Sequence, residues 1–314
     1  MIPETPDDLT AAVLAEMGRA GDARLRELLT LAVRHLHAFV REAQLTEAEF
    51  RRICAVVAEL GRRTTPSHNE VVLMAGSLGV SALVSRIDNG DGGRMPTTAN
   101  LMGPFWRDGA PSTRDGDSIV RSATPGEPLF VRVRVQDAQG RAVAGARVDV
   151  WQASAEGLYE NQDPHQADMN LRGTFTTDAE GRIAFRTVRP AGYPVPVDGP
   201  VGALLRALGR HNLRPAHLHF MVFKPGFKTQ FAQVYAHDDP NLDSDVQFGV
   251  THALVGRYVA HAHDEPAPAP DVAGRWYTLD HVLVVEPGEA VLPRPPITGK
   301  ASERPELVVL ERRA

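Results

Sequence analysis

Two histidines near the middle of the chain, His217 and His219, have a spacing that suits metal binding. They lead into the apolar run Phe220–Phe223, which predicts a β-strand. Side chains alternate along a strand, so both imidazoles would project from one face and could bind the same metal ion. The spacing alone leaves a second interpretation open, in which the two residues are a half-buried histidine pair with ordinary hydrogen-bond partners.

The other two His-x-His pairs of the chain suit metal binding less well. His35 and His37 fall in a helical pattern, in which residues two apart do not face each other. His261 and His263 lead into a proline-rich stretch that predicts an exposed loop. Only the pair at 217 and 219 combines a predicted strand with a nearby cation, Arg214.

Two of the five tyrosines lie in segments that predict turns or loops. Tyr193 opens the stretch Tyr193–Pro200, whose prolines make the backbone rigid enough to orient a phenol. Tyr159 follows a predicted strand end and turn that begins at Trp151. The alternative for each tyrosine is an amphipathic packing residue with a solvated hydroxyl group.

These residues stand among short motifs that resemble the intradiol catechol dioxygenases. That family includes catechol, chlorocatechol and hydroxyquinol 1,2-dioxygenases and, more distantly, protocatechuate 3,4-dioxygenase. The resemblance covers most of the chain, and it is specific because many motifs occur together. The motifs are Gly103–Phe105, Gly109–Pro111, Asn170–Gly173, Thr177–Gly181, Pro190–Tyr193, Asp198–Pro200, Gly209–His211 and Arg214–Phe220.

The resemblance implies a non-haem Fe(III) centre with one iron per chain. The implied ligands are two tyrosinates and two histidines, which fall on Tyr159, Tyr193, His217 and His219. Phenolate and imidazole suit iron, and two anionic phenolates favour Fe(III) over Fe(II). A ferric ion would also lower the pKa of a bound substrate hydroxyl group.

The resemblance also assigns catalytic roles to three residues. Tyr193 would leave the iron and accept a substrate proton, and Arg214 would stabilise negative charge that develops on the ring. Gln233 would be the active-site glutamine. From residue type alone, Arg214 could instead be a surface ion-pair partner, and Gln233 could satisfy a backbone group. The implied substrate pocket is lined by Leu73, Gly76, Leu101, Met102, Gly103 and Phe105.

The implied reaction cleaves a catecholic ring between its two hydroxylated carbons and incorporates both atoms of O2. The stretch after Tyr193 and the segment Gly103–Phe105 favour hydroxyquinol, which would give maleylacetate. Catechol and substituted or chlorinated catechols, which would give cis,cis-muconates, are the alternative, because Gly76 stands where hydroxyquinol enzymes tend to carry an acidic residue.

Two other classes of protein would explain part of the pattern. One is a non-catalytic β-sandwich binding protein, in which the tyrosines and histidines are packing residues and no metal is needed. The other is a zinc-dependent hydrolase, which would use the same histidines with a carboxylate or thiolate as third ligand. Iron content, colour and oxygen consumption distinguish both from a dioxygenase.

The composition is that of an ordinary globular protein. The 314 residues are 43% hydrophobic and 23% charged, and the net charge of −5 does not indicate a nucleic-acid partner. We see no signal peptide at the N-terminus and no apolar run long enough to span a membrane. The single cysteine, Cys54, excludes internal disulfides and fits the cytoplasm, and its helical setting predicts a buried thiol.

The chain predicts an α+β fold with a boundary near residue 100. Residues 1–100 read as a helical domain, with helices that begin after Asp22, after Thr46 and near Ser67 or Asn69. Residues 101–314 read as an antiparallel β-sandwich of many short strands. In that part Asp178–Gly181 predicts a hairpin, Lys224–Gly226 predicts a turn, and residues 201–208 predict a helix.

The resemblance adds an assembly to this fold. It implies a homodimer that forms through the N-terminal helices, and some members of the family hold a lipid between the helices of the two subunits. The sequence pattern itself shows only that the first hundred residues have an apolar face to bury.

Overall fold

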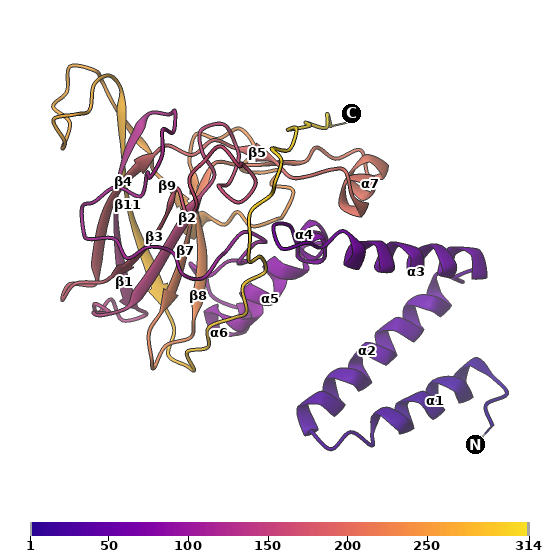
Figure 1. Ribbon diagram of the computed structural model, residues 1–314. Coiled ribbons are helices and arrows are strands. Elements are labelled where there is room, and N and C mark those ends of the chain that lie inside the picture. The colour runs from indigo at the N-terminus through magenta and orange to yellow at the C-terminus, as the bar shows by residue number, and fades with distance from the viewer. Residues whose placement is uncertain (1, 313–314) are drawn as a thin grey trace. The chain divides into compact units, whose positions relative to one another are not determined.

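A computed structural model describes residues 2–312 (Figure 1). Contacts divide the chain into two compact units, of which one ends at Ala58 and the other begins at Glu59. Helices come first and strands follow, so the predicted α+β class is confirmed. The expected boundary at residue 100 does not coincide with this division by contacts, and it stays a prediction about which segment folds by itself.

The first unit is built from helices α1 (Pro6–Met17), α2 (Ala23–Glu42) and most of α3 (Glu47–Arg62). Two of the predicted helix starts are confirmed. The carboxylate of Asp22 accepts a hydrogen bond from the Leu25 N–H at 2.6 Å. At the start of α3, the Thr46 hydroxyl accepts a hydrogen bond from the Glu49 N–H at 3.3 Å, and the Thr46 N–H donates to the Glu49 carboxylate at 2.9 Å. Helix α1 was not predicted from the sequence.

These three helices carry a large exposed apolar surface. No residue in Pro6–Met17, Ala23–Glu42 or Glu47–Arg62 is buried, and Leu36 and Val57 are each 62% exposed. Cys54 is exposed as well, so the expectation of a buried thiol is wrong for the single chain. The helical period correctly located the apolar face, but that face lies uncovered.

The second unit contains the helices α4 (Glu70–Ser77), α5 (Val80–Asp88), α6 (Gly90–Gly93) and α7 (Pro200–Ala207). Asn69 caps α4 by accepting a hydrogen bond from the Val72 N–H, which selects one of the two expected starts. Helix α4 packs against α7, where the buried carboxylate of Glu70 accepts a hydrogen bond from the Val201 N–H at 2.9 Å. The predicted helix over 201–208 is therefore confirmed with slightly shifted ends.

Among residues 2–312, no single helix combines the length and apolar composition of a membrane span. Helices α4 and α5 pass that test only as a pair, and the pair bends by 77°.

Two β-sheets form the body of the second unit (Figure 1). The strands are β1 (Pro128–Asp137), β2 (Arg147–Gln152), β3 (Arg172–Thr176), β4 (Arg182–Val188), β5 (Tyr193–Pro194), β6 (Leu213–Arg214), β7 (His217–Phe223), β8 (Gln230–Ala236), β9 (Val255–Gly256), β10 (Val259–His261) and β11 (Trp276–Val285). One sheet has the order β10-β11-β1-β4 and the other β3-β2-β7-β8-β9, while β5 and β6 pair separately. Most pairs are antiparallel, but β1 with β11 and β8 with β9 are parallel.

The main core lies between the two larger sheets. Alternate residues of β1, such as Leu129, Val131 and Val133, are at most 2% exposed and share one cluster with Leu218 and Phe220 of β7. The other face of β7 is also buried, because loops and helices cover it. This double burial explains why His217–Phe223 is apolar nearly throughout, apart from its two histidines.

One predicted turn has a different role in the structure. Asp178–Gly181 connects β3 to β4, which belong to different sheets, so the expected hairpin is wrong. Alternation predicts that two segments are strands, but it does not say which sheet each one joins. The turn at Lys224–Gly226 does join the antiparallel neighbours β7 and β8, as predicted.

Candidate metal centre

Four side chains predicted from the sequence meet at one point on the covered face of the five-stranded sheet. His217 and His219 project from the same face of β7, and their Nε2 atoms lie 3.0 Å apart. The hydroxyl of Tyr159, from the loop after β2, lies 2.9 Å from the His219 Nε2 and 3.1 Å from the hydroxyl of Tyr193. The distance from the Tyr159 hydroxyl to the His217 Nε2 is 3.4 Å.

These distances fit a shared metal ion. Two ligands that each lie about 2.0–2.1 Å from a first-row metal, at angles near 90–110°, are separated by about 2.9–3.4 Å. The separations among Tyr159, His217 and His219 and that between Tyr159 and Tyr193 fall in this range. Two of the four donor atoms are imidazole nitrogens and two are phenol oxygens. Within residues 2–312, no group of three or more histidine, cysteine, aspartate or glutamate side chains could hold a metal. The third ligand that a zinc hydrolase would need is therefore not found there.

Burial keeps all four side chains neutral in the absence of a metal. None is more than 4% exposed. Burial raises the pKa of the Tyr159 hydroxyl well above its usual value, and it raises the pKa of Tyr193 although the charge of Arg214 opposes it. Burial, with a smaller effect of Arg214, lowers the pKa of His217 to about 3. Neutral imidazole is the form that binds metals, and a bound cation would favour the phenolates.

The two imidazoles are held in different ways. The His217 Nδ1–H donates to the carbonyl oxygen of Pro215 at 2.6 Å, which leaves the lone pair of Nε2 directed at the centre. The ring of His219 stacks on Trp151, with centroids 4.6 Å apart and 14° between the planes. Its Nδ1 atom is buried and has no hydrogen-bond partner among the described residues.

Tyr159 stands in a cluster of buried charges. Arg172 is 1% exposed and donates to the Glu160 carboxylate at 2.7 Å, to the Asn161 side chain at 3.0 Å and to the Phe105 carbonyl at 2.8 Å. The ring of Phe105 in turn lies 4.6 Å from the ring of Tyr159. One guanidinium therefore fixes both the residues that follow Tyr159 and the aromatic ring that packs on it.

Arg214 is buried beside the centre, so its interpretation as a surface ion-pair partner is wrong. It is 2% exposed, and its Nε and Nη2 atoms lie 3.0 Å from the two carboxylate oxygens of Asp245. Its Nη1 atom lies 3.4 Å from the His217 Nε2. Burial alone would raise the pKa of Asp245, but the charge of Arg214 and hydrogen bonds to the carboxylate lower it. The pair is therefore ionised.

Gln233 connects Arg214 to a predicted pocket segment. Its Oε1 accepts hydrogen bonds from Arg214 at 2.7 Å and from the Tyr235 hydroxyl at 2.6 Å. Its Nε2 donates to the Leu101 carbonyl at 2.8 Å, so it also satisfies a backbone group, as the alternative interpretation had it. Sequence analysis missed Asp245 and Tyr235, because nothing in their sequence neighbourhood indicates that they would meet Arg214.

Most of the residues predicted to line a substrate pocket lie near the centre. Leu73 and Phe105 are buried in the same cluster as Tyr159 and Tyr193. A Cβ atom added at Gly103 would meet His219 at 3.4 Å, which places this glycine against the ligand ring. Leu101 is buried and Met102 half-buried.

The space next to Gly76, which has no side chain of its own, is occupied by another residue. An added Cβ atom would lie 1.7 Å from the Oε1 of Gln247. Gln247 is 2% exposed, and its Nε2 donates to the Ser77 hydroxyl at 2.8 Å. The amide of Gln247, which sequence analysis missed, therefore fills the space next to Gly76.

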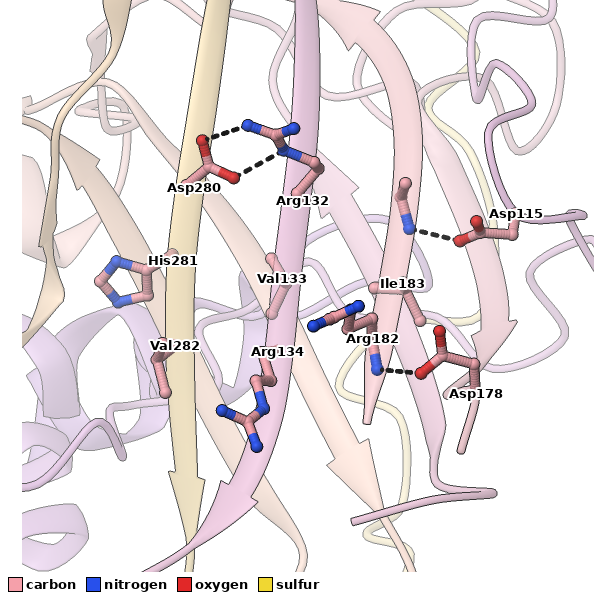
Figure 2. A pocket seen from close by; sticks show the side chains of 11 residues that line it. Asp115, Arg132, Val133, Arg134, Asp178, Arg182, Ile183, Asp280, His281 and Val282 are labelled. Atoms are coloured by element: carbon pink, nitrogen blue, oxygen red, sulfur yellow. Dashed lines mark hydrogen bonds and ion pairs between the residues drawn. The ribbon is translucent and has the colours of Figure 1, made fainter. Parts of the chain in front are cut away.

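A groove of about 690 Å³ lies elsewhere, on the outer face of the sheet that contains β1, β4 and β11 (Figure 2). Three arginines and three aspartates line it, and the ion pair of Arg132 with Asp280 at 2.6 Å crosses it. None of the site residues predicted from the sequence lines this groove. Its charges balance, and it contains no convergent donor set like that at Tyr159.

Comparison with known proteins gives matches over most of the chain. Residues 101–283 match the family described as "Dioxygenase", and residues 22–92 match "Catechol dioxygenase N terminus". The chain is similar to a hydroxyquinol 1,2-dioxygenase of Rhizobium sp. (strain MTP-10005), with 39% identity over 87% of this chain and 92% of the relative. It is also similar to a 6-chlorohydroxyquinol 1,2-dioxygenase of Cupriavidus pinatubonensis, with 41% identity over 80% and 91%.

The chain is also similar to a catechol 1,2-dioxygenase and to a solved structure. A catechol 1,2-dioxygenase of Candida albicans is 34% identical over 87% of this chain and 89% of the relative. The solved structure of hydroxyquinol 1,2-dioxygenase from Pseudomonas putida DLL-E4 superposes with a TM-score of 0.77 and 36% identity, covering 90% of this chain and 99% of that one.

Proposed function

Because this chain belongs to the intradiol ring-cleavage dioxygenases, we propose that Tyr159, Tyr193, His217 and His219 hold its one non-haem Fe(III) ion. The enzyme is an intradiol 1,2-dioxygenase of aromatic catabolism. The observation that supports the ligand set is the convergence of two phenol oxygens and two imidazole nitrogens at 2.9–3.4 Å. Phenolates and imidazoles together suit ferric iron better than zinc or magnesium.

When bound, ferric iron would act as a Lewis acid that a catecholate chelates through both oxygens, and it would make the ring reactive toward O2. A catechol that binds through both oxygens loses two protons, one to hydroxide from solvent and one to a base of the protein. Tyr193 is the base that we propose for one of them, because its hydroxyl belongs to the donor set and its loop is rich in proline. Protonation at the Tyr193 oxygen would release that ligand and free a position for the substrate.

Arg214 is proposed to stabilise the negative charge that develops on the ring. Its side chain is always cationic, and Asp245 and Gln233 fix its orientation. The Nη1 atom of Arg214 faces His217 and the centre, while its Nη2 atom donates to the carboxylate of Asp245. Gln233 acts through Arg214 and through the Leu101 carbonyl, so we propose it as a positioning residue for both.

We propose hydroxyquinol as the substrate and maleylacetate as the product. The 39% and 41% identical relatives named for hydroxyquinol and 6-chlorohydroxyquinol support this choice. The proposed pocket is lined by Leu73, Gly76, Leu101, Met102, Gly103 and Phe105.

Catechol or a substituted or chlorinated catechol, cleaved to a cis,cis-muconate, is the second candidate. The similarity to a catechol 1,2-dioxygenase favours it. The absence of an acidic residue at Gly76 also leaves room for this alternative.

We further propose a cytoplasmic homodimer that forms through the N-terminal helices, an interface that holds a lipid in some members of the family. The exposed apolar side chains of α2 and α3 support an interface there, because monomers rarely leave so large an apolar face in water. The match to a catechol dioxygenase N terminus over residues 22–92 supports the same surface. Light scattering would give the oligomeric state, and mass spectrometry of a solvent extract would detect the lipid.

The test of the function is colour, iron content and oxygen uptake of the purified protein. We expect a red to burgundy protein with about one ferric ion per chain, because tyrosinate ligation gives a phenolate-to-iron charge-transfer band. Oxygen uptake with a panel of catechols would identify the substrate, with hydroxyquinol giving the highest kcat/KM. Full loading with zinc or manganese and no visible band would refute the iron assignment.

A further inference from the structure

The C-terminal segment of the described chain lies along the loop that carries Tyr193. Residues 194–198 and 305–308 line one groove together with Gln162. In Figure 1 the yellow segment near the C-terminus passes close to β5, the short strand that begins at Tyr193. Leu310, near the end of this segment, packs against the cluster that contains Tyr159 and Tyr193.

Asn212 joins three segments at this point. It is fully buried, and its Nδ2 donates to the Val195 carbonyl at 2.7 Å and to the Val308 carbonyl at 2.9 Å. Its Oδ1 accepts a hydrogen bond from the Leu310 N–H at 2.8 Å. Its own backbone carbonyl accepts one from the Val195 N–H at 2.8 Å. One side chain therefore links the Tyr193 loop, the strand of Arg214 and the C-terminal segment.

The loop needs such a link because it can form few backbone hydrogen bonds of its own. Prolines at 194 and 196 remove the N–H donors on both sides of Val195. Strand β5 has only two residues and pairs only with β6, where Tyr193 lies opposite Arg214. At the far end, Arg206 donates to the Val197 carbonyl at 3.0 Å, which anchors the loop to α7. Between these anchors, Asn212 makes the contacts to Val195.

The packing next to Tyr193 is tight on the same side. A Cβ atom added at Gly157 would lie 3.1 Å from the Tyr193 Cβ and 3.6 Å from the Leu307 Cδ1. The backbone of Gly157 also has a φ of +81°, which favours glycine. The C-terminal segment therefore lies close to Tyr193, and the absence of a side chain at Gly157 permits this close packing.

We propose that Asn212 and residues 305–310 form a clip that restrains Tyr193, and that this clip sets how readily Tyr193 leaves the metal when substrate binds. Asn212 is a positioning residue in this proposal, since it touches neither the donor atoms nor the substrate. The inference rests on the proposed function in one respect, which is that Tyr193 is a metal ligand. Tyr159 is restrained by Arg172 and does not depend on the clip.

Truncation provides the main test. A chain that ends at Arg304 loses the whole clip segment, whereas one that ends at Leu310 keeps every contact described above. Arg304→Ala is a second control, because it removes an ion pair with Glu156 from the same segment outside the clip. Asn212→Ala removes the amide from the other side and keeps the segment, so it tests the clip even where the truncated chain does not fold.

The first measurement is amide hydrogen exchange in the metal-free and the iron-loaded protein. We expect exchange at Val195 to become at least tenfold faster in the chain that ends at Arg304 and in Asn212→Ala. Exchange around Tyr159–Asn161 should stay within twofold, and both controls should match the unmodified protein. Unchanged exchange at Val195, or an equal increase at both tyrosines, would overturn the clip.

The second measurement is rapid mixing of the iron-loaded protein with catechol in the absence of O2. The tyrosinate charge-transfer band should change several-fold faster in the two clip variants than in the controls, because Tyr193 is released more easily. Equal rates in variants and controls would overturn the proposal. An unmodified protein that binds no iron would instead refute the proposed function, and the exchange of the metal-free protein would still report on the clip.

Discussion

The two tyrosines of the centre are held by contrasting surroundings. Tyr159 is followed directly by Glu160, whose carboxylate lies 2.7 Å from both Arg107 and Arg172. Tyr193 begins a two-residue strand and a proline-rich loop, and the Val195 carbonyl of that loop accepts a neutral hydrogen bond from the amide of Asn212. The protein therefore fixes the segment after Tyr159 with buried charges, and it restrains the loop after Tyr193 with weaker, uncharged contacts.

The energies of these contacts explain why the contrast matters for catalysis. Breaking a buried ion pair by removing one partner costs about 3–5 kcal/mol, whereas a neutral hydrogen bond contributes about 0.5–1.5 kcal/mol. A ligand that must stay bound suits the first setting, and a ligand that must leave and return suits the second. The comparison predicts different responses to substitution at the two tyrosines.

The largest difference should appear when the ligands themselves are replaced. Tyr159→Phe, His217→Ala and His219→Ala should lose iron and nearly all activity. Tyr193→Phe should keep more iron, because Tyr193 is the ligand that we propose to leave during turnover, but it should not process substrate normally. Elemental analysis of the four purified variants measures the difference. Iron loss in Tyr193→Phe as complete as in His217→Ala would contradict the role of a departing ligand.

Arg214→Leu should separate charge stabilisation from metal binding. We expect the colour and catechol binding to remain while turnover falls about a hundredfold, as for the loss of one preorganised donor. Asp245 is left buried without its partner, so the variant should also lose about 3–5 kcal/mol of stability. Stopped-flow spectra separate binding from the chemical step, and denaturant unfolding measures the stability.

The same experiment has a clear opposite outcome. If Arg214→Leu abolishes catechol binding and leaves the rate of the chemical step unchanged, the electrostatic role is wrong. Arg214→Lys serves as a control, because it keeps the charge but cannot form the two-point contact with Asp245.

Arg172→Met should weaken the surroundings of Tyr159 while leaving those of Tyr193 intact. Glu160 keeps Arg107 as a partner, so we expect a loss near the lower end of the range, about 3 kcal/mol. Asn212→Ala should cost less, about 1–3 kcal/mol, because only neutral groups lose their partner. Unfolding by urea compares the two variants, and a larger loss for Asn212→Ala would reverse the proposed contrast.

The smallest effect is expected at Gly76, which lies outside both settings. Glycine disfavours a helix by about 1 kcal/mol relative to alanine, so a functional reason for it is plausible. Gly76→Asp should raise the kcat/KM for hydroxyquinol relative to catechol, because the carboxylate could accept a hydrogen bond from the third hydroxyl. The end of Gln247 must move aside, so Gly76→Asp combined with Gln247→Ala should show a larger shift.

Kinetics with both substrates, on folded and iron-loaded variants, would measure that shift. If the ratio of the two kcat/KM values is unchanged in both variants, position 76 does not contribute to discrimination between the two substrates. The tyrosinate band should stay the same throughout, since neither substitution touches the proposed ligands.

The parts of this molecule that follow from local pattern were predictable from the sequence. Helix caps at Asp22, Thr46 and Asn69 depend on neighbouring residues, and the shared face of His217 and His219 depends on the period of a strand. The meeting of Tyr159 and Tyr193 with those histidines depends on the tertiary fold, so only resemblance to a family could indicate it. Asp245 and Gln247 reach the site from a loop without a recognisable motif. Loops have no regular spacing of apolar residues, so the sequence pattern could not have predicted these contacts.

The stacking of Trp151 on His219 gives the protein a built-in optical reporter. An indole 4.6 Å from a ligand ring lies close enough for efficient energy transfer to a coloured centre. Trp276 provides an internal reference, because it stacks on His261 in the four-stranded sheet, whereas His217 and His219 belong to the five-stranded sheet. Intrinsic fluorescence should therefore fall as iron is added to the apoprotein, and Trp151→Phe should remove most of that signal without any need for substrate or oxygen.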